Sequence, residues 1–114
     1  MYIKNIQFHN LYNTVLLNIE NYLDHFNSQH DIDYEVNHQI MTILFENQSK
    51  IIITKQEVLK QIWLATKKNG YHFSYQNKNW ICNRSQENFW HILEKSFYLQ
   101  GDEKVSFKQF IISS

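Results

Sequence analysis

The feature that most constrains the fold is a series of short strand-like segments separated by turns of a few residues. These segments are rich in β-branched and aromatic residues, as is typical of strands. They span residues 31–36, 40–45, 50–54, 61–66, 71–75 and 80–82. Parallel neighbours would need crossover connections of roughly a dozen residues or more. The short turns therefore predict one antiparallel sheet, with Asn69-Gly70 as the strongest hairpin signal.

Helix-like patterns lie on both sides of the strand segments. Residues 3–26 have helical spacing, and one face carries Leu11, Val15, Ile19, Tyr22 and Phe26. A second helix is predicted to begin near Ser85, a favourable N-cap, and to end near Gly101. Its buried face comprises Phe89, Leu93 and Phe97, with Trp90 beside that face. The tail, residues 102–114, contains an alternating stretch at 105–107 and is left unassigned.

The predicted order is helix, six strands, helix, which indicates an α+β fold. Two helices can pack on one face of an antiparallel sheet and leave the other face partly exposed. In the 61–65 segment, Ile62 and Leu64 would point to the helices, and Gln61, Trp63 and Ala65 to the open face. An exposed Trp among polar neighbours is a candidate anchor for a protein partner. A bulge that shifted the alternation would instead place Trp63 in the core.

Length and composition indicate one soluble domain spanning residues 1–114. Aromatic residues make up 16% of the chain, so large rings are expected to fill much of the core. No apolar run approaches the ~20 residues of a membrane span, and residues 1–10 lack the apolar stretch of a signal peptide. The lone Cys82 excludes an internal disulfide framework and a multi-thiolate zinc site. We therefore expect a cytoplasmic protein, most simply a monomer.

The net charge is zero, but the charges are segregated along the chain. Between Lys4 and Lys50 there is no basic residue, and this stretch has a formal charge of −6 and holds four of the six histidines. From Lys50 onward the formal charge is +5. A pole of carboxylate and imidazole groups favours a cation or a basic partner. A solvated surface with no function would show the same segregation.

Motifs of catalytic sites are not found in the sequence. Two glycines cannot build a phosphate-binding loop, and there is no His-Glu-x-x-His pair. Cys82 lies inside a predicted strand, which favours a packed thiol over a nucleophile. His72 and His91 are isolated, and no spacing suggests a Ser-His-acid triad. We therefore expect a protein that is not an enzyme.

The strongest candidate site is a group of acids on the first helix and first strand. Glu20 and Asp24 are four residues apart on the helix, so their carboxylates share one face. Asp31 and Asp33 share one face of the first strand with Glu35. If that strand is the sheet edge beside the helix, these groups form one ridge. Such ligands suit iron(II) or manganese, bound weakly at an exposed surface. The alternatives are a solvated helix face and an edge strand whose charges prevent aggregation.

Several stretches closely resemble the frataxin family in its bacterial branch. In chain order they are DIDYE at 31–35, FENQSKIII at 45–53, TKQEVLKQIWLA at 54–65, GYHF at 70–73, WICNRS at 80–85 and FW at 89–90. The resemblance runs from about Phe8 to Phe107, nearly the whole chain. It implies the frataxin-like α/β sandwich, with two helices on one face of an antiparallel sheet.

The resemblance also implies a function. Frataxins bind iron weakly on the acidic ridge and regulate iron–sulfur cluster assembly by engaging the cysteine desulfurase near the scaffold protein. The ridge positions of the family match Glu20, Asp24, Asp31 and Asp33, with His9 at the ridge end. Its exposed sheet positions match Gln56, Gln61 and Trp63.

This chain departs from the family pattern in the ridge. Neutral side chains stand where bacterial relatives often carry acids, at Asn21, His25, Asn27 and Gln29. His25 can still serve as a ligand when it is neutral. Fewer carboxylates weaken the attraction of cations and basic partners, so iron-independent docking is a second hypothesis. A third hypothesis is a protein that binds single-stranded nucleic acid through aromatic side chains on the sheet, near Lys50, Lys55, Lys60 and Lys67. Salt-dependent binding of RNA would support it.

Overall fold

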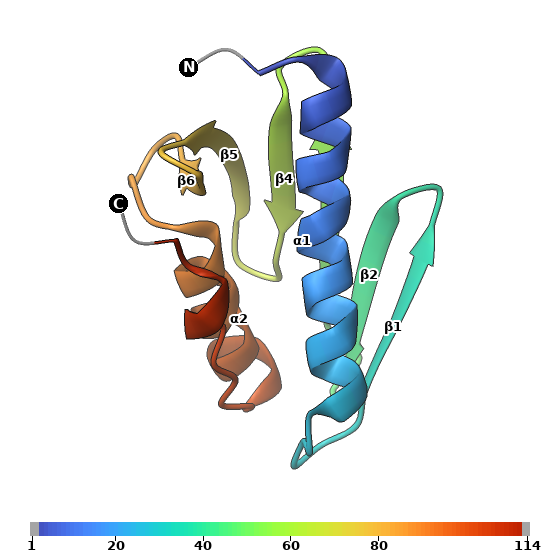
Figure 1. The fold of residues 1–114 in the computed structure, drawn as a ribbon. Coiled ribbons are helices and arrows are strands. Elements are labelled where there is room, and N and C mark those ends of the chain that lie inside the picture. The colour runs from blue at the N-terminus through green and yellow to red at the C-terminus, as the bar shows by residue number, and fades with distance from the viewer. Residues whose placement is uncertain (1–2, 113–114) are drawn as a thin grey trace.

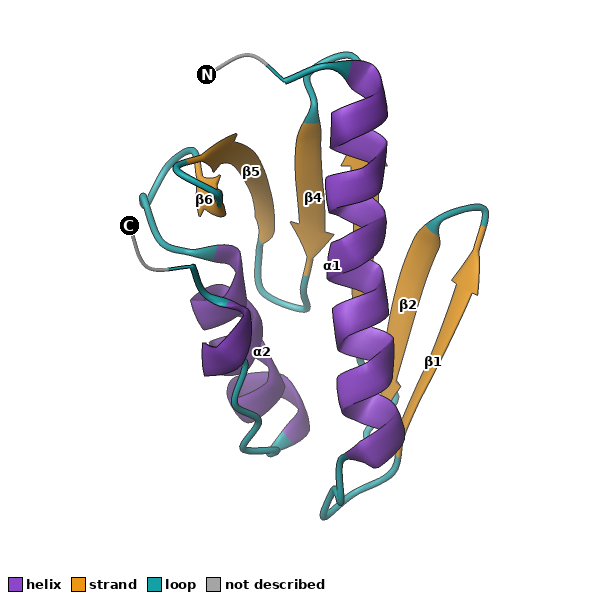
Figure 2. Cartoon of the chain, viewed as in Figure 1, coloured by secondary structure: helices purple, strands orange, loops and turns teal. Residues whose placement is uncertain are grey.

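The computed structural model, which describes residues 3–112, confirms the predicted α+β architecture. A six-stranded sheet has the spatial order β1-β2-β3-β4-β5-β6, and every neighbouring pair is antiparallel. The two long helices lie side by side over the same face of this sheet (Figure 1, Figure 2). The elements are α1 (Asn5–His25), β1 (Ile32–Asn37), β2 (Ile40–Phe45), β3 (Lys50–Gln56), β4 (Gln61–Ala65), β5 (Gly70–Gln76), β6 (Asn79–Cys82), α2 (Phe89–Gly101) and a 3₁₀ turn η1 (Lys108–Phe110).

The sheet is two-sided, as the alternation in its strands predicts. Every second residue of the central strands is buried under the helices, including Ile51, Ile53, Ile62 and Leu64. Their neighbours on the other face, such as Trp63, are only half-buried. The predicted orientation of the 61–65 segment is therefore confirmed, and no bulge moves Trp63 into the core.

The buried stripe of α1 is rotated from the predicted one. It consists of Phe8, Tyr12, Val15, Leu16 and Ile19. Val15 and Ile19 were expected there, whereas Leu11, Tyr22 and Phe26 are only half-buried. The stripe follows Phe8 and Tyr12 because the sheet accommodates both the ring and the hydroxyl of Tyr12. Tyr12 Oη donates to the carbonyls of Gln39 (2.5 Å) and Ile53 (3.3 Å), so its burial leaves no polar atom unpaired.

The start of α2 differs from the prediction. The N-cap is Asn88, whose side chain accepts the Trp90 N–H at 2.9 Å, and the helix begins at Phe89. Ser85 instead belongs to a turn after β6, in which Cys82 N–H donates to the Glu87 carbonyl at 2.8 Å. The same turn holds Gln86 at a φ of 64°, which a right-handed helix cannot contain. Trp90 is buried rather than beside the buried face, because the C-terminal tail covers it.

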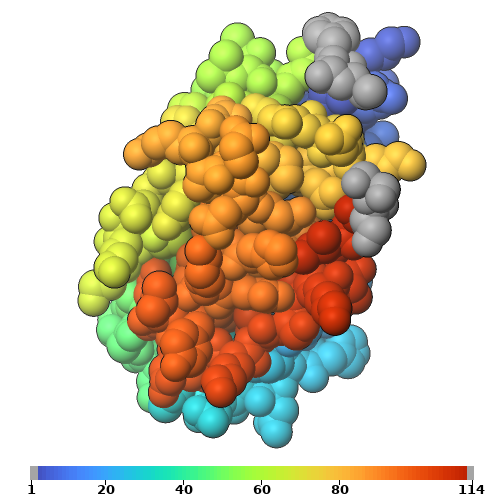
Figure 3. Space-filling model, turned by 90° about the vertical axis from the view of Figure 1, so that its left-hand side faces the viewer, coloured from blue at the N-terminus to red at the C-terminus, as the bar shows by residue number. Residues whose placement is uncertain are grey.

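The C-terminal tail, for which the sequence predicts no element, packs between the two helices. Phe107 is fully buried, with its ring centroid 4.9 Å from that of Tyr22 on α1 and 5.3 Å from that of Trp90 on α2. Figure 3 shows the tail in red along one side of α2. The backbone N–H of Phe107 also donates to Glu94 Oε2 at 2.7 Å. The tail therefore completes the core.

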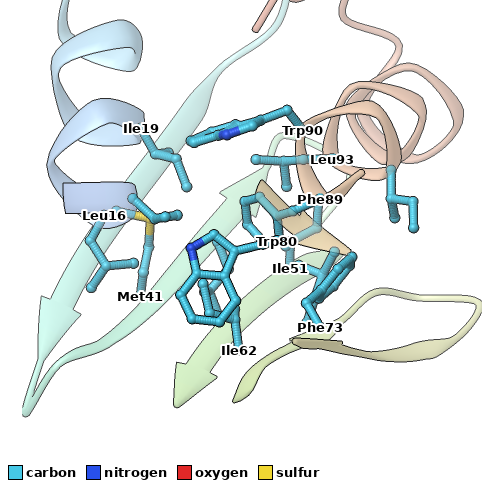
Figure 4. Close-up of a cluster of buried hydrophobic side chains, with 14 of the residues drawn as sticks. Leu16, Ile19, Met41, Ile51, Ile62, Phe73, Trp80, Phe89, Trp90 and Leu93 are labelled. Carbon is cyan, nitrogen blue, oxygen red and sulfur yellow. The ribbon is translucent and has the colours of Figure 1, made fainter. Parts of the chain in front are cut away.

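The core combines side chains from both helices and the sheet. Figure 4 shows Leu16 and Ile19 of α1 and Trp90 of α2 above Ile51 and Ile62 of the sheet. Edge-to-face ring pairs join the layers, such as Phe73 with Phe89 at 5.1 Å. Aromatic rings thus fill much of the interior, as the composition predicts.

The helix α2 ends at Gly101, as predicted, whereas Gly70 does not have the predicted place in a turn. Gly70 does not form the turn of the β4–β5 hairpin: it begins β5, and neither glycine has a positive φ. The turn is Thr66–Asn69, in which Thr66 Oγ1 accepts the Asn69 N–H at 3.1 Å. Gly101 lies inside the last turn of α2, and the left-handed cap residue is Asp102, at a φ of 53°. A Cβ at Gly101 would overlap the Phe45 ring, whereas at Gly70 the space is open.

This contrast gives a stability prediction. Gly101→Ala should destabilise the fold by about 1–3 kcal/mol, because overpacking forces the Phe45 ring and α2 apart. Gly70→Ala should be neutral or stabilising by up to about 1 kcal/mol. Urea unfolding followed by circular dichroism measures both variants. Equal unfolding midpoints for the two would contradict the close packing of α2 on Phe45.

Candidate functional site

The edge strand β1 lies beside the C-terminal half of α1, as the ridge hypothesis requires. β1 has one strand neighbour, β2. A direct contact ties it to the helix: Tyr34 Oη donates to Asp24 Oδ1 at 2.6 Å. This hydrogen bond to a carboxylate raises the pKa of Tyr34 to about 12. One oxygen of Asp24 is therefore already engaged by a neutral donor.

The acids of β1 lie on the open face of the sheet, whereas those of α1 lie on the helix side. Tyr34 points to the helix side, so its neighbours Asp33 and Glu35 point to the open side. There they line a groove of about 240 Å³ together with Thr42, Leu44 and Lys50. Across residues 3–112, no three His, Cys, Asp or Glu side chains are grouped closely enough to hold a metal ion. A cation at the ridge would meet few carboxylates and mostly water, which gives weak binding.

The two candidate histidines lie at opposite ends of α1. His25 Nδ1 is 2.8 Å from the Asn21 carbonyl oxygen, which leaves Nε2 toward solvent. His9 is sixteen residues away, or roughly 24 Å along the helix. Lys55 Nζ donates to His9 Nδ1 at 2.6 Å, and His9 Nε2 is 4.0 Å from Glu57 Oε1. The structure therefore keeps His9 apart from Asp24 and beside a cationic lysine. The metal-binding roles of Glu20, Asp24, Asp31, Asp33, His9 and His25 all remain predictions.

The predicted partner-binding residues come together on the open face of the sheet. Gln56 and Gln61 are direct cross-strand partners on β3 and β4, and Trp63 lies two residues along β4. Trp63 Nε1–H donates to Gln61 Oε1 at 2.8 Å, which fixes the indole orientation. The Trp63 ring stacks on His72 of β5, with centroids 4.2 Å apart and planes 9° apart. We call Gln56, Gln61, Trp63 and His72 the sheet patch.

His72 is the member of the sheet patch that sequence reasoning missed. It pairs with Trp63 because the hairpin register is Ala65↔Gly70, Trp63↔His72. The sequence prediction put residues 67–70 in the turn, which gives a different register. The sequence signal for the observed register is Thr66, because a threonine hydroxyl can accept a hydrogen bond from a nearby backbone N–H and so stabilise a turn at 66–69. Lys55, in contrast, does not face this patch: its ammonium lies 5.8 Å from the Tyr12 ring on the helix side.

A second charged cluster, around His30, links three connections: the α1–β1 loop, the β2–β3 turn and the start of the tail after α2. His30 Nε2 is 3.3 Å from Asp102 Oδ2, and His30 Nδ1 is 3.5 Å from Glu46 Oε2. The backbone N–H groups of Gln29 and His30 donate to the buried carboxylate of Glu103, at 2.9 and 2.6 Å. The hydrogen bond to Asp102 raises the pKa of His30, and the charges of Glu103 and Glu46 act in the same direction.

This cluster predicts a pH dependence of stability. The folded-state pKa of His30 lies above its unfolded value of about 6.5. The stabilisation is therefore complete below that pH and is lost as pH rises through the folded-state pKa. His30→Gln should lower the melting temperature more in weak acid than in weak base. His91→Gln, on the exposed face of α2, is the control. A His30→Gln effect that grows with rising pH would contradict this.

No helix within residues 3–112 is both long and apolar enough to cross a membrane.

Together, the two-helix layer on one face, the open sheet patch on the other and the acidic edge strand define an α/β sandwich of the frataxin type. A family model described as a frataxin-like domain matches residues 1–103. The chain belongs to the frataxin family.

Named relatives are similar over nearly the whole chain. The "Iron-sulfur cluster assembly protein CyaY" of Buchnera aphidicola subsp. Acyrthosiphon pisum (strain Tuc7) is 49% identical over 104 residues, which cover 91% of this chain and 90% of that protein. The CyaY protein of Buchnera aphidicola subsp. Schizaphis graminum (strain Sg) is 49% identical over 106 residues, covering 93% and 88%. The solved frataxin of Psychromonas ingrahamii has a TM-score of 0.84 and 36% identity, covering 93% of this chain and 99% of that one.

Proposed function

We propose that this protein regulates iron–sulfur cluster assembly in the cytoplasm by docking onto the cysteine desulfurase and its scaffold protein. It binds iron weakly on the acidic ridge, and it is not itself an enzyme. Membership of the frataxin family and relatives named as cluster assembly proteins support the general role. The finer roles rest on the residues described above.

The observation that carries the docking proposal is the sheet patch. It lies on the face of the sheet opposite α1 and α2 (Figure 2). Trp63 is held by two partners, Gln61 and His72, so its indole is already ordered before a partner arrives. An ordered, half-exposed Trp on a rigid strand loses little side-chain entropy on binding. Such residues are typical anchors of protein interfaces.

The docking proposal is tested by titrating a purified bacterial cysteine desulfurase into the isotope-labelled protein. The expected result is a set of amide shifts centred on Gln56, Gln61, Trp63 and His72. Shifts confined to α2, or no binding at all, would overturn the assignment of the sheet patch.

The second candidate, an iron-independent interaction module, is favoured by the geometry of the ridge. The acids of α1 and β1 face different sides of the strand, and Tyr34 engages Asp24. An anaerobic iron(II) titration separates the two candidates. Selective broadening at Glu20, Asp24 and residues 31–33 supports iron binding on the ridge. If millimolar iron causes no broadening there, only the docking role remains.

Tyr34 gives a more specific prediction for the ridge. Tyr34→Phe removes the hydrogen bond to Asp24 and frees a carboxylate oxygen. Since such a bond contributes about 1 kcal/mol, the affinity for manganese(II) should rise about fivefold. Paramagnetic broadening of the Asp24 amide measures the affinity, with Tyr98→Phe on α2 as a control that removes a tyrosine hydroxyl away from the ridge. Unchanged or weaker binding by Tyr34→Phe would show that Asp24 is not a ligand.

A further inference from the structure

The outer face of α2 carries apolar residues that the fold leaves in solvent. Leu99 is 69% exposed and Tyr98 is 53% exposed. Leu99 separates two grooves. One, of about 400 Å³, lies between α2 and the β4–β5 turn and is lined by Lys67, Lys68 and Tyr71 among others. The other, of about 500 Å³, lies between α2 and the tail and is lined by Lys95, Lys104 and Val105 among others.

Figure 3 views this face directly, with α2 in orange between the yellow-green β4–β5 turn and the red tail. We call Lys67, Lys68, Lys95, Tyr98, Leu99 and Lys104 the α2 surface. It lies on the helix side of the sandwich, so it is separate from the sheet patch on the opposite face. A partner on the α2 surface would leave the sheet patch free.

The charges of the α2 surface select the kind of partner. Within residues 3–112, no ion pair engages Lys67, Lys68 or Lys104. Lys95 is paired with Glu87, at 2.7 Å. The acid that lines the same groove, Glu94, already accepts the Phe107 N–H. The two grooves are lined by four lysines and one acid, so the local balance is positive.

The geometry points to a docking site for an acidic protein segment that carries apolar side chains. Two grooves on either side of Leu99 let such a segment place one apolar side chain in each groove. Its carboxylates would meet Lys67 and Lys68 on one side and Lys104 on the other, which gives specificity and a faster encounter. A lipid surface fits less well, because Tyr98 and Leu99 protrude from the α2 surface while the other apolar side chains that line it are recessed in the grooves.

The test uses a short fluorescent peptide in which glutamates flank one phenylalanine and one leucine. Two control peptides replace the glutamates with lysines or the two apolar residues with serines. Fluorescence anisotropy should show binding of the first peptide only, weakening as salt is added. Amide shifts should fall on Lys67, Ser96, Leu99 and Lys104.

Substitutions on the α2 surface show which side chains contribute to peptide binding. The double change Lys67→Glu, Lys68→Glu and the single change Leu99→Ser should each weaken binding about tenfold. Lys78→Glu, which reverses one charge in the β5–β6 turn outside the α2 surface, is the control for altered net charge and should leave affinity unchanged. The proposal is overturned if the first peptide does not bind or if the lysine peptide binds equally well. Lys78→Glu matching the double variant would overturn it too. So would capture by phosphatidylglycerol vesicles that needs the same lysines, without peptide binding.

Discussion

Phe107→Ala is expected to destabilise the fold by about 3–5 kcal/mol, the usual cost of removing a buried aromatic ring. Phe107 is fully buried and touches both helices and the neighbouring ring of Phe97, at 5.8 Å. Its loss leaves a cavity between α1 and α2 that neither helix can close, since both are fixed to the sheet. A domain of this size has about 5–15 kcal/mol of stability in total. The variant should therefore approach the limit of folding.

Urea or thermal unfolding followed by circular dichroism measures the Phe107 effect. Ile112→Ala is the control, because Ile112 is on the same tail but 45% exposed. Its backbone contacts with Asn79 do not involve its side chain. A loss of less than about 1 kcal/mol for Phe107→Ala would contradict the packing of the tail between the helices.

Trp63→Ala is expected to weaken desulfurase binding about thirtyfold, corresponding to roughly 2 kcal/mol for an interface hot spot. The indole supplies both the apolar area and an orientation fixed by Gln61 and His72. Trp63→Phe should lose less, because it retains an aromatic ring over His72 but not the N–H donor. Isothermal titration with the purified desulfurase measures both variants.

The fold of Trp63→Ala should remain intact, because Trp63 is only half-buried. Its melting temperature and amide spectrum outside the sheet patch check this. Ile112→Ser, on the tail, controls for a general loss of exposed apolar area. If Trp63→Ala binds the desulfurase as tightly as the unmodified chain, the sheet patch is not the docking site.

The sheet and its orientation could be predicted because their signals are local. Alternation in the 61–65 segment fixes which side chains face the helices, and short connections fix antiparallel neighbours. The N-cap of α2 was misplaced because Ser85 is also a good turn residue, and the turn after β6 extends two residues beyond it. The sequence alone does not show whether Ser85 serves as a helix N-cap or as a turn residue.

The contacts of the tail and of the acidic ridge were less predictable, because each joins side chains of different elements, whose relative placement no local pattern gives. Phe107 is buried only because α1 and α2 leave a space of its size between them. The ridge acids could be listed from the sequence, but the Tyr34–Asp24 and Lys55–His9 contacts could not. These two contacts determine which carboxylate and imidazole atoms are free to meet a cation.

The most direct test of the proposed function is an anaerobic reconstitution of cluster assembly with a bacterial cysteine desulfurase, its scaffold protein, iron(II) and cysteine. Cluster formation is followed by absorbance and circular dichroism while this protein is added in increasing amounts. The proposed function predicts a dose-dependent change in the initial rate that Trp63→Ala abolishes. An unchanged rate at every ratio of protein to desulfurase would contradict it.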